Sequence, residues 1–349
     1  MTSTPFVEIA TSGGFFDSAA KGSSAPGWLV DGIVESWGLD RALTSVVLIT
    51  VSENATFLVS ISGAPVAVTR VARPGYMAGT AAFESEVAWV AALADSPYVR
   101  VPRSIPTVGG GYVAVLRDER GMSWSCVSYS YVAGSILEDF TDPVPYYREI
   151  GRTTAHLHDQ VRGWTPPVGF TRHSWALADM VGPSCRWGQW KDAGFTATEQ
   201  ALLTSVERSA LVTVAAVPRS SADWGLIHAD LRPSNIMIDD GVLTVIDFDD
   251  CGYSWYLYDF ASALSFMEHV DDAPTMAKEW VDGYCEVRPL SRTDEQLACA
   301  LSMVRRLQMQ GWTTTHREDS LPPVLWSAQK DGTLAVAERF QRSATWLLD

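Results

Sequence analysis

Residues 224–250 read Trp-Gly-Leu-Ile-His-Ala-Asp-Leu-Arg-Pro-Ser-Asn-Ile-Met-Ile-Asp-Asp-Gly-Val-Leu-Thr-Val-Ile-Asp-Phe-Asp-Asp. A short apolar run enters a polar loop from His228 to Asn235. Two short β-rich runs follow, and Asp239-Asp240-Gly241 between them is a typical signal of a tight hairpin. The hairpin leads into three carboxylates, Asp247, Asp249 and Asp250. The stretch therefore predicts a loop and a hairpin that bring several polar groups together.

The spacing of three polar residues is suited to phosphoryl transfer. Asp230 and Asn235 flank the loop, and Asp247 returns beside them at the end of the hairpin. Phosphoryl transfer needs a carboxylate that orients the attacking hydroxyl and oxygen ligands that hold Mg²⁺ on the nucleotide phosphates. The order matches the kinase signature His-Arg-Asp-Leu-x-x-x-Asn followed by Asp-Phe-Gly. Here Ala229 replaces the arginine and Asp249 replaces the glycine.

These two departures point to a subfamily. The stretch resembles the aminoglycoside phosphotransferase and choline kinase-like superfamily, whose loop reads His-x-Asp-x-x-x-x-Asn and whose metal segment is Asp-x-Asp or Asp-x-Glu. Within it, the runs Leu-Ile-His-Ala-Asp-Leu-Arg-Pro-Ser-Asn and Val-Ile-Asp-Phe-Asp-Asp-Cys-Gly look most like the bacterial phosphotransferase branch. That branch also contains type II homoserine kinases and stress-response Ser/Thr kinases.

The resemblance implies an α+β, bilobal, protein-kinase-like fold. We expect a flexible arm over residues 1–27, a nucleotide-binding lobe with an antiparallel sheet and a helix over 28–132, and a larger helical lobe over 133–349. The implied cofactors are ATP or GTP and Mg²⁺. The implied reaction moves the γ-phosphate to a hydroxyl of a small molecule.

Roles for the loop residues follow from the same resemblance. Asp230 would orient the substrate hydroxyl and accept its proton, while Asn235 and Asp247 would hold Mg²⁺. Arg232 stands where a fixed cation could stabilise the transferring phosphoryl group, or could form a salt bridge within the loop. Asp249 is either a second metal ligand or a support for its segment.

Composition limits the partners. The 349 residues are 47% hydrophobic and carry a formal net charge of −15. Neither nucleic acid nor an anionic membrane would be attracted to such a chain without a local basic patch, and no Lys/Arg run supplies one. The five cysteines are widely spaced and lack metal-ligand partners, as in a cytoplasmic protein. We expect a cytoplasmic monomer or homodimer without a signal peptide or membrane span.

The first predicted hairpin joins Ser45–Val51 to Thr56–Ile61. Kinases cover the nucleotide phosphates with a glycine-rich loop at this place. This loop has no glycine, so phosphate contact through Ser52 and Asn54 is implied by position alone; the alternative is an ordinary polar turn.

The next strand, Pro65–Val71, carries Arg70 where kinases have a lysine on the nucleotide phosphates. An arginine can bind phosphate and carboxylate through its planar fork. On the helix predicted over Ala78–Ala94, Glu86 is the candidate ion-pair partner of Arg70, and Glu84 is the alternative.

Further strands are predicted at 101–106, 111–117 and 124–129. The last leads into a segment that resembles the linker between lobes, where backbone groups of Ser130 and Val132 could bind the nucleotide base. Helices are predicted from Tyr146 and over 196–214, 274–287, 294–310 and 334–346. His158 and His228 are interpreted as hydrogen-bonded structural residues, and Asp259 as the group that ties the loop backbone together.

The acceptor is the least determined part. Antibiotics, amino alcohols and protein Ser/Thr all occur as acceptors in the family. An ammonium-bearing substrate could be attracted by Asp250, Trp255, Glu268, Asp271 and Asp272, although a solvated acidic face would look the same. A Ser/Thr protein kinase is disfavoured because no long docking segment ends in Ala-Pro-Glu. A pseudokinase is suggested by the missing glycine loop and by Arg70, and opposed by the intact Asp230, Asn235 and Asp247.

Overall fold

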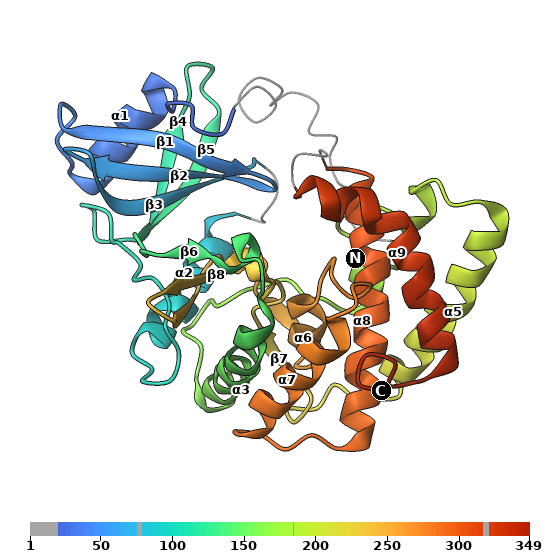
Figure 1. The fold of residues 1–349 in the computed structure, drawn as a ribbon. Helices are drawn as coiled ribbons and strands as arrows, with labels where there is room; N and C mark the ends of the chain where they lie inside the picture. Colours follow the sequence, from blue (N-terminus) through green and yellow to red (C-terminus); the bar gives the residue numbers. More distant parts are fainter. Residues whose placement is uncertain (1–19, 75–78, 184, 317–320) are drawn as a thin grey trace. The chain divides into compact units, whose positions relative to one another are not determined.

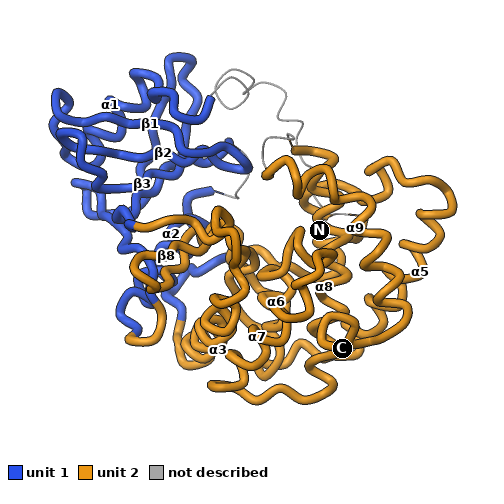
Figure 2. Tube along the Cα trace, in the orientation of Figure 1, with its two compact units in different colours: residues 1–96, 100–133, 166–172 blue, residues 97–99, 134–165, 173–349 orange. Residues whose placement is uncertain are grey.

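A computed structural model of the protein describes residues 20–74, 79–183, 185–316 and 321–349. The chain divides into two compact units (Figure 2). Unit 1 holds residues 1–96, 100–133 and 166–172, and unit 2 holds 97–99, 134–165 and 173–349. One division falls after Ala133, next to the boundary expected at residue 132. Most of the predicted arm lies outside the described residues, but residues 22–25 hydrogen-bond to strand β1 (Thr44–Val51).

Unit 1 is built on an antiparallel sheet (Figure 1). Its strand order is β1-β2-β3-β5-β4, and every neighbouring pair is antiparallel. The remaining strands are β2 (Asn54–Ile61), β3 (Ala64–Ala72), β4 (Val113–Arg117) and β5 (Ser123–Ser130). The β2–β3 turn places Ser62 and Gly63 at positive φ, the pair of left-handed residues that a tight type I′ hairpin requires.

A helix packs on each face of this sheet. Helix α1 (Gly27–Trp37) forms one apolar cluster with residues such as Cys126, and helix α2 (Thr80–Ala94) forms the other with residues such as Val127. Neighbouring residues of β5 thus belong to opposite clusters, because successive side chains of a strand point to opposite faces. The sheet is buried on both sides, which fixes the register of β3 and β5.

The prediction of a strand at 101–106 is wrong. This segment makes only an isolated bridge, Ser104 to Tyr129, although Arg103 and Ile105 exchange backbone hydrogen bonds with β5. Pro102 and Pro106 explain the difference, because proline has no N–H to donate to a ladder.

Unit 2 is mainly helical and carries two small sheets (Figure 1). One sheet pairs β7 (Trp224–Ile227) with β10 (Gly252–Trp255), and the other has the order β6-β8-β9. Its strands are β6 (Ser135–Ile136), β8 (Ile236–Asp239) and β9 (Val242–Val245). The helices are α3 (Tyr147–Gly163), α4 (Leu177–Met180), α5 (Ala197–Ala215), α6 (Tyr258–Ala263), α7 (Ala273–Cys285), α8 (Arg292–Thr313) and α9 (Pro323–Arg342).

Helix α8 is the centre of unit 2. It packs against α5, α6 and α9 and is buried along most of its length. Helix α9 begins at Pro323, well before the start predicted at residue 334. The prediction missed its first half because Gly332 interrupts the helical signal. A Cβ at Gly332 would lie 2.6 Å from the ring of His269, so close packing explains this glycine. Within the described ranges, no helix is both long and apolar enough to cross a bilayer.

Helices α3 and α7 touch through two glycines. A Cβ at Gly151 would lie 2.0 Å from the carbonyl oxygen of Trp280, and one at Gly283 would lie 1.9 Å from that of Arg148. Rigid backbone atoms cannot yield as a flexible side chain can, so the two helices must separate if either glycine gains a side chain.

We expect Gly151→Ala to lower the free energy of unfolding by about 1–3 kcal/mol, as overpacking does in close-packed interiors. Urea denaturation would measure this loss. Gly163→Ala is the matched control, because it lies in the same helix with nothing within 4 Å of its Cβ position. An equally large loss in both variants would contradict the packing argument.

Candidate active site

The 228–235 loop is held by a buried carboxylate. It follows β7, and Asp259, in the first turn of α6, accepts hydrogen bonds from the backbone N–H of Ala229 (2.7 Å) and of His228 (3.2 Å). The N–H of Leu231 donates to Ser262 Oγ one turn further along α6. Ala229 takes a left-handed conformation with φ of 69°. The role expected of Asp259 is therefore present in the structure.

His228 links this loop to the segment that carries Asp247. Its Nδ1 accepts from the backbone N–H of Asp230, and its Nε2 faces the carbonyl oxygen of Ile246 at 3.1 Å. A carbonyl can only accept, so these partners select the neutral tautomer with the proton on Nε2. The ring is buried against Phe248. His228 is a hydrogen-bonded structural residue, as the sequence suggested.

His158 supports the same arrangement from α3. Its Nε2 lies 3.1 Å from Asp259 Oδ2, and its Nδ1 lies 2.9 Å from the hydroxyl of Tyr284. Burial lowers the pKa of His158, against the opposing effect of Asp259. The histidine is fully buried and acts as a hydrogen-bonding support.

Asp230 is surrounded by donors. Asn235 Nδ2 donates to Asp230 Oδ2 at 2.8 Å, and Arg232 Nε lies 3.5 Å from the same oxygen. The other oxygen, Oδ1, accepts from Arg305 at 2.5 Å. Arg232 also lies 3.9 Å from Glu138, whose pKa is raised by burial despite that arginine. The loop salt bridge considered for Arg232 is thus present.

Arg305 was not predicted from the sequence. It stands on α8, 75 residues beyond Asp230, and its side chain is only 1% exposed. The available signal was the pair Arg305-Arg306 between apolar residues of a long helix. Charged side chains are almost never fully buried unless they are paired, so such a pair indicates two internal ion pairs.

The segment that carries Asp247 returns beside the loop through the β8–β9 hairpin. The N–H of Ile246 donates to the carbonyl oxygen of Asn235, which places Asp247 next to Asn235. The two bonds of the Asn235 side chain both use Nδ2 and leave Oδ1 out. Asp247 takes a left-handed backbone conformation with φ of 60°. Asp249, two residues further along the chain, has a partly exposed side chain.

These residues fit a nucleotide-bound magnesium ion. In the described part of the chain, no group of three or more His, Cys, Asp or Glu side chains could hold a metal ion by itself. Mg²⁺ in nucleotide sites is bound through one or two protein oxygens, while phosphates and water complete its octahedron. An amide oxygen and a carboxylate side by side are that kind of donor set.

Two of the residues suggested for acceptor binding belong to the interior instead. Trp255 is 2% exposed, donates from Nε1 to the carbonyl oxygen of Val217 and packs edge-on against Trp224. Glu268 is fully buried and pairs with Arg306 at 2.7 Å. The expectation that both face a substrate is wrong, because hydrophobic and ionic partners within unit 2 already cover them.

Asp250 is placed differently. It is 6% exposed, and its backbone carbonyl accepts from Trp175 Nε1 at 2.7 Å. Its carboxylate lies near enough to Arg305 and Tyr258 to act on their pKa values. Asp250 therefore belongs to the same group of side chains as Asp230.

In unit 1, Arg70 pairs with Glu86 and not with Glu84. One guanidinium nitrogen of Arg70 lies 2.7 and 2.6 Å from the two carboxylate oxygens of Glu86. Tyr129 donates to Glu86 at 2.7 Å, and Arg172 lies 3.8 Å away. Burial alone would raise the pKa of Glu86, but Arg70 and Arg172 outweigh burial and lower it.

The β1–β2 hairpin differs from the expected phosphate loop. Asn54 is 3% exposed, and its Oδ1 accepts from the backbone N–H of Arg73. The guanidinium of Arg73 donates to the carbonyl oxygen of Ser52. Asn54 is therefore a structural residue of the hairpin. Arg73 is a cation at this tip that sequence reasoning missed, because it lies beyond the strand that carries Arg70.

At the predicted linker, the two candidate backbone groups differ. The N–H of Ser130 donates to the carbonyl oxygen of Arg103 at 2.8 Å, so it cannot also bind a base. The N–H of Tyr131 donates to the carbonyl oxygen of Val66. Val132 follows it near the end of the 100–133 segment of unit 1 and is partly exposed. Val132 is the better placed of the two.

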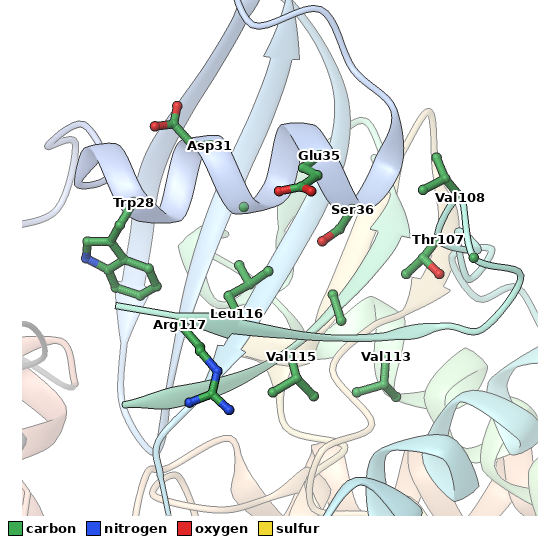
Figure 3. A pocket seen from close by; sticks show the side chains of 13 residues that line it. Trp28, Asp31, Glu35, Ser36, Thr107, Val108, Val113, Val115, Leu116 and Arg117 are labelled. Atoms are coloured by element: carbon green, nitrogen blue, oxygen red, sulfur yellow. The ribbon is translucent and has the colours of Figure 1, made fainter. Parts of the chain in front are cut away.

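A groove of about 600 Å³ in unit 1 involves none of these residues. It runs between α1 and β4, with Asp31 and Glu35 on the helix and Leu116 and Arg117 on the strand (Figure 3). A groove alone therefore does not mark the candidate site, which rests on the side-chain chemistry around Asp230.

Comparisons with known proteins identify the family of the chain. The model of the "Phosphotransferase enzyme family" matches residues 48–296, so the chain belongs to that family. Amicoumacin kinase of Bacillus subtilis (strain 168) is 26% identical over 180 residues, which span 51% of this chain and 51% of that relative, about half its length.

Solved structures extend the similarity over nearly the whole chain. A microcompartment-associated aminopropanol kinase has a TM-score of 0.82 and 33% identity, and the match covers 92% of this chain and 99% of that kinase. The amicoumacin kinase hAmiN, in complex with AMP-PNP, Ca²⁺ and Ami, has a TM-score of 0.70 and 15% identity, and the match covers 89% of this chain and 92% of that chain. At that identity the second comparison supports the fold alone. The α+β, kinase-like fold expected from the sequence is confirmed.

The Arg70–Glu86 pair gives a test of the nucleotide contact. We expect Arg70→Ala to reduce kcat/KM for ATP about 10- to 100-fold, because that ratio corresponds to the free energy of one charge-assisted hydrogen bond. Arg70→Lys should recover part of the loss, because a point charge lacks the planar fork. Steady-state kinetics would measure both.

Glu86→Gln should behave as a milder Arg70→Ala, and the double variant should lose less than the two single losses combined. Glu84→Ala is the control, because Glu84 is exposed on the same helix. Independent losses for Arg70 and Glu86, or an unchanged KM for ATP in Arg70→Ala, would separate the pair from nucleotide binding.

Asp247→Ala should abolish the rise in melting temperature that Mg·ATP causes, since ligand binding stabilises only a protein that binds the ligand. Excess chelator should have the same effect on the unmodified protein. Asp239→Ala, an exposed carboxylate on the same hairpin, should keep the full rise. Retention of the rise in Asp247→Ala would place the metal elsewhere.

Proposed function

We propose that the protein is a small-molecule kinase that transfers the γ-phosphate of Mg·ATP to the hydroxyl of a small amino alcohol. The observation that carries this proposal is the arrangement of Asp230, Asn235 and Asp247. The hydrogen bonds of Asn235 tie Asp230 on one side and the start of the Asp247 segment on the other.

Asp230 would accept a hydrogen bond from the substrate hydroxyl and take its proton as the oxygen attacks phosphorus. Asn235 and Asp247 would hold the magnesium ion, with Asp249 as a further ligand or support. When bound, this ion would neutralise charge on the β- and γ-phosphates. Arg232, beside Asp230, could interact with the transferring group. Arg70 would contact the nucleotide phosphates, and Val132 the base.

The class of acceptor is inferred from similarity. The aminopropanol kinase is 33% identical over nearly the whole chain. Of the two amicoumacin kinases, one matches over about half its length and the other is only 15% identical. Similarity over the full chain includes the acceptor-binding parts of unit 2, so it favours an amino alcohol over an antibiotic. Asp250 is buried as well, but unlike Trp255 and Glu268 it lies among the side chains around Asp230, so it remains the candidate partner of an ammonium group.

Other activities have less support. Arg70 forms the ion pair that kinases form with a lysine, which argues against a pseudokinase. A protein kinase would need a docking segment after Asp250, but β10 and α6 follow within a few residues.

Incubation of the purified protein with Mg·ATP and a panel of acceptors would test the proposal. The panel should hold 1-amino-2-propanol, ethanolamine, homoserine, choline, aminoglycosides and a Ser/Thr peptide. We expect phosphate transfer to an amino alcohol. Transfer only to an antibiotic or to the peptide would contradict the proposed acceptor, and repeating the assay with GTP would determine the preferred nucleotide.

Asp230→Asn should reduce kcat by about 10²–10⁴, because it removes a general base without removing a metal ligand. Its melting temperature should still rise with Mg·ATP. A variant that keeps the kcat of the unmodified protein would exclude Asp230 from the mechanism.

A further inference from the structure

Two neighbouring arginines of α8 are buried and paired with different carboxylates. Arg305 is 1% exposed and contacts Asp230, while Arg306 is fully buried and contacts Glu268. A helix turns about 100° per residue, so adjacent side chains point to different neighbours. One arginine therefore faces the proposed site and the other faces the interior.

All three nitrogens of the Arg305 guanidinium are occupied. Nε donates to Ser265 Oγ at 2.9 Å, Nη1 to the hydroxyl of Tyr258 at 2.8 Å and Nη2 to Asp230 at 2.5 Å. Tyr258 in turn donates to the side chain of Gln308, one turn along α8. The guanidinium is held in one orientation from α6, from α8 and from the segment after α6.

The charge of Arg305 is secured by the same contacts. Burial alone would lower the pKa of Arg305, but Tyr258 and Asp230 outweigh burial and raise it. Arginine is in any case charged at all relevant pH values. A fixed positive charge thus lies against one oxygen of Asp230.

The contacts leave a defined part of Asp230 for a substrate. An ionised carboxylate offers about four lone-pair positions. Arg305 takes one position on Oδ1 and Asn235 takes one on Oδ2, and Arg232 Nε lies 3.5 Å from Oδ2. The two bonds come from opposite ends of the carboxylate and prevent its rotation, so the remaining lone pairs point in set directions.

We propose that Arg305 is a positioning residue of the phosphoryl transfer, which fixes the Asp230 carboxylate so that its remaining lone pairs face the acceptor hydroxyl. The proposal rests on the proposed function. It assigns Arg305 no contact with the substrate or the nucleotide, and its effect passes through Asp230 alone. A misplacement of a reacting group by about 1 Å can reduce a rate by about 100-fold.

Arg305→Met and Arg305→Lys test this role against matched changes at Arg306. We expect Arg305→Met to lower kcat about 10- to 100-fold while KM for ATP changes less than about threefold, since only turnover depends on Asp230. Arg305→Lys should recover part of kcat, because an ammonium can reach Asp230 but cannot also serve Ser265 and Tyr258.

Arg306→Met and Arg306→Lys should lower the melting temperature without lowering kcat, when all variants are assayed below their melting temperatures. A fall in kcat at Arg306 as large as that at Arg305 would overturn the proposal in favour of a general loosening of α8. An unchanged kcat in Arg305→Met would overturn it as well.

A double-mutant cycle separates positioning from other effects. In the Asp230→Asn background, Arg305→Met should cost far less kcat than in the unmodified protein, because the group it positions is gone. Arg306→Met should show no such dependence. Multiplicative losses for Arg305→Met and Asp230→Asn would overturn the proposal.

Tyr258→Phe covers the case in which Arg305→Met does not fold. It removes one of the contacts of Arg305 and keeps the ion pair, so we expect a smaller fall in kcat than in Arg305→Lys, again with KM for ATP unchanged. A rise in KM for ATP with kcat unchanged would contradict the role.

The melting temperatures of the same cycle distinguish failure of this proposal from failure of the proposed function. If no amino alcohol is phosphorylated but the two substitutions remain coupled in melting temperature, the proposed acceptor is wrong and the ion pair is real. If an amino alcohol is phosphorylated and kcat shows no coupling, the function stands and the role of Arg305 is wrong.

Discussion

The buried carboxylate of Asp259 accepts hydrogen bonds from two consecutive backbone N–H groups, and His158 completes its surroundings. Hydrogen bonds to a charged acceptor stabilise by about 1.5–3 kcal/mol each, whereas a left-handed residue such as Ala229 costs about 1–3 kcal/mol. The free energy gained from the two hydrogen bonds therefore exceeds the cost of the left-handed conformation of Ala229. The position of Asp230, one residue further on, depends on this balance.

Helix α8 joins this loop to the rest of unit 2. Its two arginines serve different carboxylates, and every guanidinium nitrogen of each donates a hydrogen bond: Arg306 donates to Glu268, to Thr333 and to the carbonyl oxygen of Gln329. An unpaired charge at such depth would be prohibitive, so each arginine requires its partner. Helix α9 and the segment after α6 are consequently fixed to the same helix that orients Asp230.

The sequence predicted the parts of the site that short spacing determines. Asp230 and Asn235 share one loop, and a hairpin with an Asp-Gly turn returns Asp247 beside them. For Arg70 the sequence offered Glu86 with Glu84 as the alternative, and the structure shows the pair with Glu86. It could not predict the contact of Arg305 with Asp230, because that contact joins two elements that only tertiary packing brings together. Trp255 and Glu268 were misjudged for the related reason that burial, and not residue type, decides what a side chain can bind.

Backbone strain shows the same division between local and tertiary causes. In the turns at Ser62 and Asp240, the glycine that follows also has a positive φ. Such a residue-glycine pair is a turn signal that can be read from the sequence. Ala229, Asp247 and Phe266 have positive φ values of 69°, 60° and 68° without such a signal. The first two lie in the proposed site, and the ring of Phe266 lies 5.6 Å from the guanidinium of Arg232. Strained conformations persist only where surrounding contacts over-determine them, and they gather where a fixed geometry is needed for function.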